Sequence, residues 1–347
     1  GGDLGRARAL VDAAASAGAD CAKFQIVYAD EILHPDTGFV TLPGGSVRLY
    51  DRFRELEVSP SFFAEIKDYC ERKGLIFLCS PFGIRSVREL RRLEPRYIKI
   101  ASPELNHFPL LREAASCGVP LILSSGVSRL SDIEAALEAT AAAPERILLH
   151  CITSYPAPEE EYNLRVLESL RATFGVRTGL SDHSLDPVLV PVLAAACGAC
   201  MIEKHITLSR DDPGLDDPVA LDGAQFARMV RAVRDAETKD AETVIGEMST
   251  IYGRERVERI LGSGRKELAP SERANYLRTN RSIHYLRDLS AGETITEADI
   301  ALLRTEKVLN PGLGPQFLET VIDAVLARDA KNGAGAVWDD LIRRDRR

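Results

Sequence analysis

Short runs of aliphatic and β-branched residues alternate along the chain with longer segments whose hydrophobic residues recur at helical spacing. Each short run ends in polar residues, which is typical of the strands in repeated β-α units of a parallel sheet. The predicted strands are 21–27, 75–80, 97–102, 121–125, 147–153, 178–184 and 201–208. The predicted helices, several of which begin at a Ser or Asn cap, are 59–73, 86–93, 131–142, 163–174 and 222–237.

A closed (β/α)8 barrel has eight strands, and the pattern supplies seven. The first residues, 1–18, already form a predicted helix, with Asp3 as its N-cap and Leu4, Leu10 and Ala14 at helical spacing. We therefore predict an α/β fold of the (β/α)8 TIM-barrel type that lacks its first strand. An open doubly wound sheet is the alternative, but no Gly-x-Gly-x-x-Gly turn or phosphate loop follows any strand.

The pattern changes after the last predicted barrel helix. Residues 246–280 are polar and contain several Gly, Ser, Arg and Glu residues, and shorter β-like pieces follow at 281–286, 294–295, 301–304 and 321–327. We therefore predict a barrel domain over 1–245, a linker over 246–280 and a small C-terminal domain over 281–347.

Composition excludes several classes of protein. The formal net charge of -8 argues against a nucleic-acid binder, which would need a basic surface. No apolar run approaches the roughly 20 residues of a membrane helix, and the start lacks a signal-peptide pattern. The seven cysteines show no zinc-site spacing and are predicted to be buried thiols. We therefore expect a cytoplasmic protein without a membrane partner.

Polar side chains gather where the predicted strands end, which is where a (β/α)8 barrel places its reactive groups. These residues are Lys23, Gln25, Ser80, Lys99, Ser102, Glu104, Ser124, Ser125, Ser181, Asp182, His183, Glu203, Lys204 and His205. Lysines and hydroxyls at one mouth predict a pocket for an anion with a phosphate and a carboxylate, as in phosphoenolpyruvate. A buried lysine can instead form a Schiff base, so Lys99 or Lys204 would also suit a class I aldolase.

Two histidines follow neighbouring strands at equivalent positions. His183 and His205 could together bind one divalent ion, with water and substrate oxygens as the remaining ligands. Such an open site could polarise an aldehyde. Asp216, in a Pro-Gly-Leu-Asp turn beyond the last strand, is a candidate for a further ligand or a sugar-hydroxyl acceptor, or forms an ordinary Asx turn.

With these residues the sequence resembles the N-acetylneuraminate (sialic acid) synthase family, which includes spore-coat polysaccharide, legionaminate and pseudaminate synthases. The matching segments are 19–25, 80–82, 98–102, 149–151, 155–158, 180–183 and 202–205. Segments 261–266 and 281–283 resemble the family's passage into its antifreeze-like (SAF) domain. The resemblance thus implies a TIM barrel followed by a small SAF (β-clip) domain.

The resemblance also implies a reaction: condensation of phosphoenolpyruvate with an N-acetylmannosamine-like amino sugar to give a nonulosonic (sialic-type) acid and phosphate. The residues implied for phosphoenolpyruvate are Lys23, Ser80, Lys99, Ser102, Ser124 and Ser181. Those implied for the sugar are Gln25, Glu104, Tyr155, Asp216 and Arg304. His183 and His205 would hold manganese, with Mg²⁺ or Co²⁺ as alternatives, and Lys99 and Glu104 would join them in catalysis.

The family further implies a domain-swapped homodimer, in which the SAF domain of one subunit covers the barrel mouth of the other and Arg304 reaches the sugar. Three features depart from the family pattern. Its first strand would precede residue 1, Asp217 stands where the family has histidine, and Thr305-Glu306 replaces Pro-Gly. These departures leave the acceptor sugar open, and they keep a non-catalytic sugar-binding paralogue as an alternative.

Overall fold

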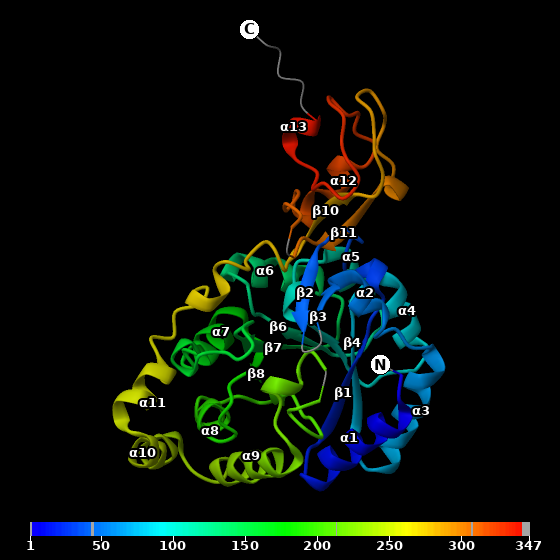
Figure 1. Cartoon of the computed structure of the whole chain (residues 1–347). Coiled ribbons are helices and arrows are strands. Elements are labelled where there is room, and N and C mark those ends of the chain that lie inside the picture. The colour runs from blue at the N-terminus through cyan, green and yellow to red at the C-terminus, as the bar shows by residue number, and fades with distance from the viewer. Residues whose placement is uncertain (1, 43–44, 213, 307, 342–347) are drawn as a thin grey trace.

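The computed structural model describes residues 2–42, 45–212, 214–306 and 308–341, and its largest element is a curled parallel sheet of seven strands (Figure 1). Neighbouring strands follow the order β1-β4-β5-β6-β7-β8-β9. Their bounds are β1 (Cys21–Ile26), β4 (Ile76–Pro81), β5 (Ile98–Ile100), β6 (Leu121–Ser124), β7 (Arg146–Cys151), β8 (Arg177–Asp182) and β9 (Ile202–Lys204). The predicted seven strands and their parallel arrangement are confirmed.

The strand ends are less well predicted than the strands. β5 ends at Ile100 rather than 102, because a 3-10 turn that includes Pro103 begins at Ser102. β9 ends at Lys204 rather than 208, and Ile206 beyond it forms only an isolated bridge with Leu221. Some of the polar residues predicted at strand ends therefore lie just beyond the ladder, namely Ser102, Glu104, Ser125, His183 and His205, while the others lie within the strands.

The sheet does not close on itself. Strands β1 and β9 form its two edges, and no described strand pairs with the outer side of either. Between them lies a cavity of about 560 Å³, lined by both strands and by hydrophobic residues such as Leu10 and Phe226 from the helices below. At its other end the cavity reaches Lys23, Glu203 and His205. The barrel is therefore partly open next to the predicted chemistry.

Helices cover the outer face of the sheet. They are α1 (Leu4–Ser16), α3 (Pro60–Arg72), α4 (Ile84–Arg91), α5 (Phe108–Ala115), α6 (Leu130–Ala139), α7 (Val166–Phe174), α8 (Leu189–Ala196) and α9 (Gly223–Ala236). Asp3 caps α1, as predicted. Ser86, predicted at a helix start, lies inside α4 and accepts a hydrogen bond from Gly83 N there. No helix in the described ranges is both long and apolar enough to cross a bilayer.

Several elements were not predicted. Between β1 and α3 the chain forms a hairpin of β2 (Phe39–Leu42) and β3 (Gly45–Arg48), followed by α2 (Leu49–Arg54). The segment predicted as a linker contains most of α10 (Ala241–Tyr252) and all of α11 (Arg254–Leu261). α11 is polar overall, but it buries Val257, Ile260 and Leu261 against the barrel helices. A polar average thus concealed an amphipathic helix.

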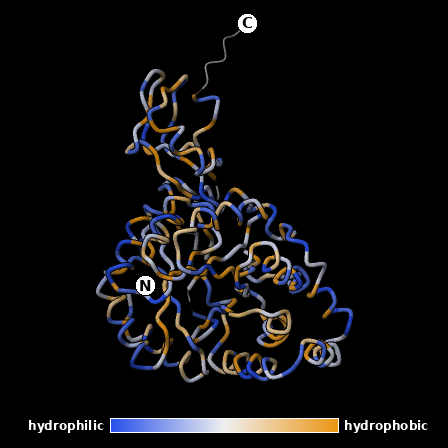
Figure 2. Tube along the Cα trace, turned by 180° about the vertical axis from the view of Figure 1, so that it is seen from behind, coloured by the Kyte–Doolittle hydropathy of each residue, from blue (hydrophilic) through white to orange (hydrophobic). Residues whose placement is uncertain are grey.

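The small domain projects from one end of the larger body (Figure 2). Its antiparallel pair is β10 (Arg281–Tyr285) and β11 (Ile300–Arg304), in a register that places Arg281 opposite Arg304. Two short helices follow, α12 (Leu318–Val321) and α13 (Trp338–Leu341). The predicted strand at 321–327 is wrong, because the chain leaves α12 there and Val325 forms only an isolated bridge.

Single 3-10 turns complete the structure. They are Ala29–Glu31, Ser102–Glu104, Glu159–Glu161, Asp217–Val219, Pro270–Glu272, Glu297–Asp299 and Pro315–Phe317. Two of them, the first and the second, follow strands β1 and β5 on the side of the sheet that meets the small domain.

Candidate active site

Four of the predicted anion-binding residues lie in one connected group, together with a carboxylate. The fully buried Lys99 donates from Nζ to Ser124 Oγ at 2.6 Å. Glu203 Oε1 lies 3.6 Å from Lys99 Nζ and 3.5 Å from Lys23 Nζ. Ser181 Oγ donates to the same Glu203 oxygen at 3.1 Å. Residues from strands β1, β5, β6, β8 and β9 thus meet at the carboxyl end of the sheet.

The charges in this group are strongly coupled. Burial by itself would raise the pKa of Glu203, but the neighbouring Lys23 and Lys99 outweigh it and lower that pKa to about 2. Burial lowers the pKa of Lys99, and Glu203 partly offsets this effect. Glu203 is therefore ionised in this group. A bound anion would further stabilise the protonated form of Lys99.

The other two predicted serines lie beside this group. Ser102 Oγ accepts a hydrogen bond from Gly126 N at 3.0 Å, in the loop after β6. A Cβ atom at Gly126 would lie 2.0 Å from the Thr153 hydroxyl, so only glycine fits there. Ser80 is buried, and its Oγ has no hydrogen-bond partner within the described chain. A buried, unpartnered hydroxyl has a donor available for a ligand.

The two predicted metal-binding histidines face each other, with ring centroids 5.4 Å apart. Tyr155 lies against them, with its ring centroid 4.2 Å from that of His183. Asp216 Oδ2 is 3.7 Å from His205 Nδ1. His183 Nδ1 is 2.7 Å from the carbonyl oxygen of Ile152, which fixes this nitrogen as the donor and makes Nε2 the nitrogen available to an ion.

This arrangement fits a divalent ion. A metal-binding histidine typically donates its other ring N–H to a backbone carbonyl or a carboxylate, as His183 does. Burial lowers the pKa of His205 to about 4, so its imidazole is neutral at pH 7 and able to bind metal. Among the described residues no cluster of three or more His, Cys, Asp or Glu side chains could hold an ion. The pair therefore suits an open site completed by water and substrate.

A buried ion pair supports the histidines from behind. Lys204 Nζ is 2.5 Å from Asp182 Oδ2, and both side chains are almost completely buried. Asp182 Oδ1 also accepts from the Tyr162 hydroxyl at 2.6 Å, and that hydroxyl in turn accepts from His183 N. Lys204 is thus held in a structural network, which argues against it as a Schiff-base nucleophile.

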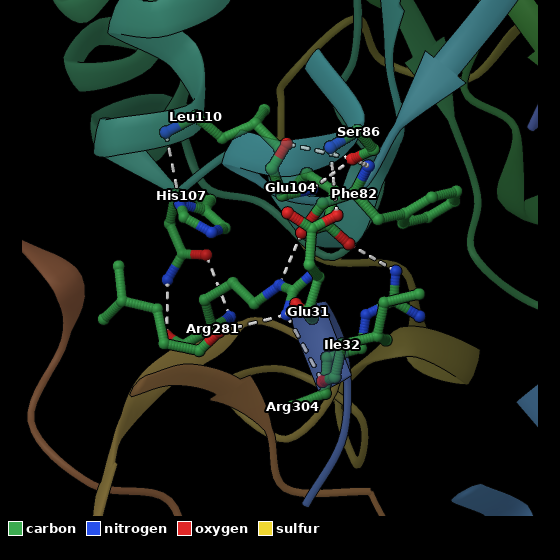
Figure 3. A network of polar contacts seen from close by, with 12 residues as sticks. Glu31, Ile32, Phe82, Ser86, Glu104, His107, Leu110, Arg281 and Arg304 are labelled. Carbon is green, nitrogen blue, oxygen red and sulfur yellow. Dashed lines mark hydrogen bonds and ion pairs between the residues drawn. The ribbon is translucent and has the colours of Figure 1, made fainter. Parts of the chain in front are cut away.

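A third group joins the barrel to the small domain (Figure 3). Glu104, fully buried after β5, accepts from Arg281 Nε at 2.5 Å through one oxygen and from Arg304 through the other. Burial would raise the pKa of Glu104, but the two guanidinium groups outweigh it and lower that pKa. Arg304, predicted to reach the barrel of a second copy, lies here on the barrel of its own chain.

One predicted residue stands apart from all three groups. Gln25 is exposed on the edge strand β1, and the described part of the chain gives it no side-chain hydrogen bond to any of them. Its place opposite Ser80 in the β1-β4 register nevertheless puts it on the rim of the same mouth.

Three charged residues, the half-buried Glu203 and the buried Arg281 and Glu272, were not among the predicted site residues. Glu203 was noted at a strand end but not selected, and Arg281 and Glu272 were not noted as candidates. Glu272 Oε1 accepts from Val127 N and Thr153 N, both at 2.7 Å, and so ties together the loops after β6 and β7. A glutamate within a polar segment gives no sequence signal of burial; only a preceding Pro-Ser pair marks the turn.

The sequence and the fold are both similar to those of known proteins. The sequence profile of the NeuB family matches residues 10–244, and that of the SAF domain matches residues 280–342. A crystal structure of the spore coat polysaccharide biosynthesis protein spsE from Bacillus subtilis superposes with a TM-score of 0.83 at 32% identity. That match covers 99% of this chain and 92% of the other.

Two further relatives have names that describe an activity. The N,N'-diacetyllegionaminic acid synthase of Legionella pneumophila is 30% identical, over 98% of this chain and 91% of that protein. A crystal structure of N-acetylneuraminic acid (sialic acid) synthetase from Leptospira borgpetersenii in complex with citrate has a TM-score of 0.63 at 29% identity, over 79% of this chain and 85% of the other. This chain belongs to the NeuB family and carries a SAF domain at its C-terminal end.

Proposed function

We propose that the protein condenses phosphoenolpyruvate with an amino sugar of the N-acetylmannosamine type, forming a nonulosonic acid and releasing phosphate. The observation that carries the proposal is the contact network of Lys23, Lys99, Ser124 and Ser181 beside the facing imidazoles of His183 and His205. An anion pocket next to an open metal site is what this condensation needs, since one reactant is a trianion and the other an aldehyde.

In the proposed mechanism the cations and hydroxyls of the anion pocket bind the phosphate and carboxylate of phosphoenolpyruvate, with Ser80 and Ser102 as further donors. Its methylene carbon then attacks the open-chain sugar aldehyde, water adds to its second carbon, and phosphate leaves with cleavage of the C–O bond. His183 and His205 would hold the ion, for which we propose Mn²⁺, with Mg²⁺ or Co²⁺ as alternatives. Such an ion supplies Lewis-acid polarisation of the aldehyde oxygen.

The sugar would lie against Tyr155, Asp216, Gln25 and the Glu104 group. Because two guanidinium groups keep Glu104 ionised, we propose it as a hydrogen-bond acceptor for a sugar hydroxyl or amide rather than as a proton donor. Lys99 would neutralise charge that develops on the enolpyruvyl group and its phosphate.

The test is phosphate release with phosphoenolpyruvate and Mn²⁺ against N-acetylmannosamine, its 6-phosphate and diamino 6-deoxyhexoses. Release with one sugar would establish both reaction and acceptor. No release with any of them would favour the non-catalytic sugar-binding alternative. Borohydride trapping with pyruvate addresses the aldolase alternative, which predicts a labelled Lys99 or Lys204, whereas we expect no label.

Lys99→Met should weaken phosphoenolpyruvate binding about 10- to 100-fold, because a buried charge-assisted donor is lost. Calorimetric titration without acceptor sugar measures this constant. The matched control is Lys73→Met, which removes a lysine paired with Asp12 on the outer surface and should leave the constant unchanged. Equal binding by Lys99→Met and the unsubstituted protein would contradict the assignment.

We also propose the division into a barrel domain at 1–245, a linker at 246–280 and a small domain at 281–347, a cytoplasmic location, and a homodimer. For the dimer we propose that each small domain stays on its own barrel. Lys266 Nζ donates to Ser125 O, and Asn106 exchanges two hydrogen bonds with the backbone of Arg281. Because Arg304 pairs with Arg281 in the β10-β11 register, this anchoring keeps Arg304 near the same barrel.

Mixing two inactive variants tests this arrangement. Co-refolding His205→Ala and Arg304→Ala chains would give mixed dimers as about half of all dimers. If small domains were exchanged, one of the two sites in each mixed dimer would combine an intact barrel with an intact small domain, so about one quarter of all sites would be active. We expect no recovery, because a domain docked on its own barrel leaves every site with one defect. Recovery near a quarter would establish the exchanged dimer that the family resemblance implies.

A further inference from the structure

Arg281 is the first residue of β10 and one of the largest fully buried side chains in the described chain. Five oxygens surround its guanidinium group, and those of Glu31, Ile32, Phe82 and Glu104 can be followed in Figure 3. Nε donates to Glu104 Oε2 at 2.5 Å, Nη2 donates to Phe82 O at 2.7 Å, and Nη1 donates to Glu31 O at 2.5 Å, Leu302 O at 3.0 Å and Ile32 O at 3.3 Å. A guanidinium group is the side chain whose planar donors suit such a ring of acceptors.

These oxygens come from separate parts of the site. Glu31 and Ile32 follow strand β1, Phe82 follows β4, and Glu104 follows β5. One residue of the small domain therefore connects three neighbouring loops at the carboxyl end of the sheet. Lys23, Ser80 and Lys99 lie within the strands themselves, which are held by their own pairing, so Arg281 acts on the loops beyond them rather than on these three side chains.

The orientation of the Glu104 carboxylate is fixed by the small domain. Its two oxygens are engaged by Arg281 on one side and Arg304 on the other, and both arginines belong to the small domain. Among the described residues, His107 also acts on Glu104, but the pKa of His107 is lowered by burial to about 3, so that this imidazole is neutral. One further carboxylate, that of Glu31, interacts electrostatically with the Arg281 guanidinium group.

We infer that Arg281 is a positioning residue for the acceptor sugar, acting through Glu104. Its planar group fixes the direction of the Glu104 carboxylate and keeps it an acceptor, while Arg304 binds the opposite oxygen. This inference rests on the proposed function. It differs from a purely structural role, in which Arg281 would stabilise the junction without any selective effect on the sugar.

The test is Arg281→Lys, which keeps a positive charge but replaces a planar fork by three donors on one nitrogen. We expect kcat/KM for the acceptor to fall about 10- to 100-fold, the equivalent of one charge-assisted hydrogen bond. The dissociation constant of phosphoenolpyruvate should change less than about twofold. Asn106→Ala is the matched control, since it loosens the same junction through the backbone of Arg281 without contacting the Glu104 carboxylate.

A double-mutant cycle decides between the two roles. In a Glu104→Gln background, Arg281→Lys should cause little further loss of acceptor kcat/KM, because the carboxylate through which Arg281 acts is already absent. Equal losses in both backgrounds, or a phosphoenolpyruvate constant that rises as much as the acceptor KM, would leave Arg281 with a structural role only. Absence of phosphate release from the unsubstituted protein would instead overturn the proposed function, and this inference with it.

If Arg281→Lys does not fold, the unsubstituted protein gives the answer. The pH profile of the acceptor kcat/KM should show no ionisation of Glu104 between about pH 5 and 8, because the pKa of Glu104 lies below the ordinary glutamate value of about 4.3. An acidic limb in that range that disappears in Glu104→Gln would show that the arginines do not hold the carboxylate ionised, and would overturn the inference.

Discussion

Replacing His205 by alanine is expected to reduce turnover by about 10³-fold, the equivalent of the several kcal/mol that a bound divalent ion contributes to transition-state stabilisation. His205 and His183 are the two imidazoles that face each other at the mouth, and His205 is neutral at pH 7 and thus ready to bind an ion. With a single imidazole left, the open site loses half of its protein ligands.

Two measurements separate this loss from general damage. Titration of the protein with Mn²⁺ should give much weaker binding in His205→Ala, while binding of phosphoenolpyruvate in the absence of metal stays close to that of the unsubstituted protein. His34→Gln is the control, because this buried histidine contacts Asn332 and Asp36 at the domain junction rather than the mouth. Unaltered Mn²⁺ affinity in His205→Ala would remove the histidine pair as the metal site.

Lys204→Met is expected to lower the free energy of unfolding by about 3–5 kcal/mol, because it leaves Asp182 buried without its cationic partner. Asp182 is fully buried, and the remaining donors to it, the Tyr162 hydroxyl and the backbone N and hydroxyl of Ser184, are neutral. Urea denaturation followed by circular dichroism measures the change through the midpoint.

The control for this experiment is Lys239→Met on the surface. Lys239 is paired with Asp235 and Glu247, whose side chains are largely exposed, so its loss should cost no more than about 1 kcal/mol. A similar small effect for Lys204→Met would mean that the buried pair contributes nothing net, and that Lys204 could be available for chemistry after all.

The sheet was predictable from the sequence because parallel strands covered by helices are buried on both faces. Segments such as Leu121–Ser124 are therefore uninterrupted hydrophobic runs that end in a polar residue. The hairpin of β2 and β3 gave no such signal, since its strands have four residues each and Gly45–Arg48 is exposed throughout. The helix α11 was hidden by the polar average of its segment.

The candidate site divides in the same way. Lys23, Lys99, His183 and His205 could be selected because each follows or interrupts a hydrophobic strand, a local pattern. Arg281 and Glu272 could not be selected, because their burial comes from partners 177 and 145 residues away in the sequence, Glu104 and Val127. No local pattern marks a charged residue that becomes buried only when a distant part of the chain packs against the barrel.

The ring of oxygens around Arg281 also has a consequence for how the protein opens. Separating the small domain from the barrel would strip one guanidinium group of acceptors on three loops at once, and would leave Glu104 buried without a counter-charge. Partial opening is therefore unfavourable. The protected amide hydrogens at the junction should exchange with solvent in a single cooperative event rather than loop by loop.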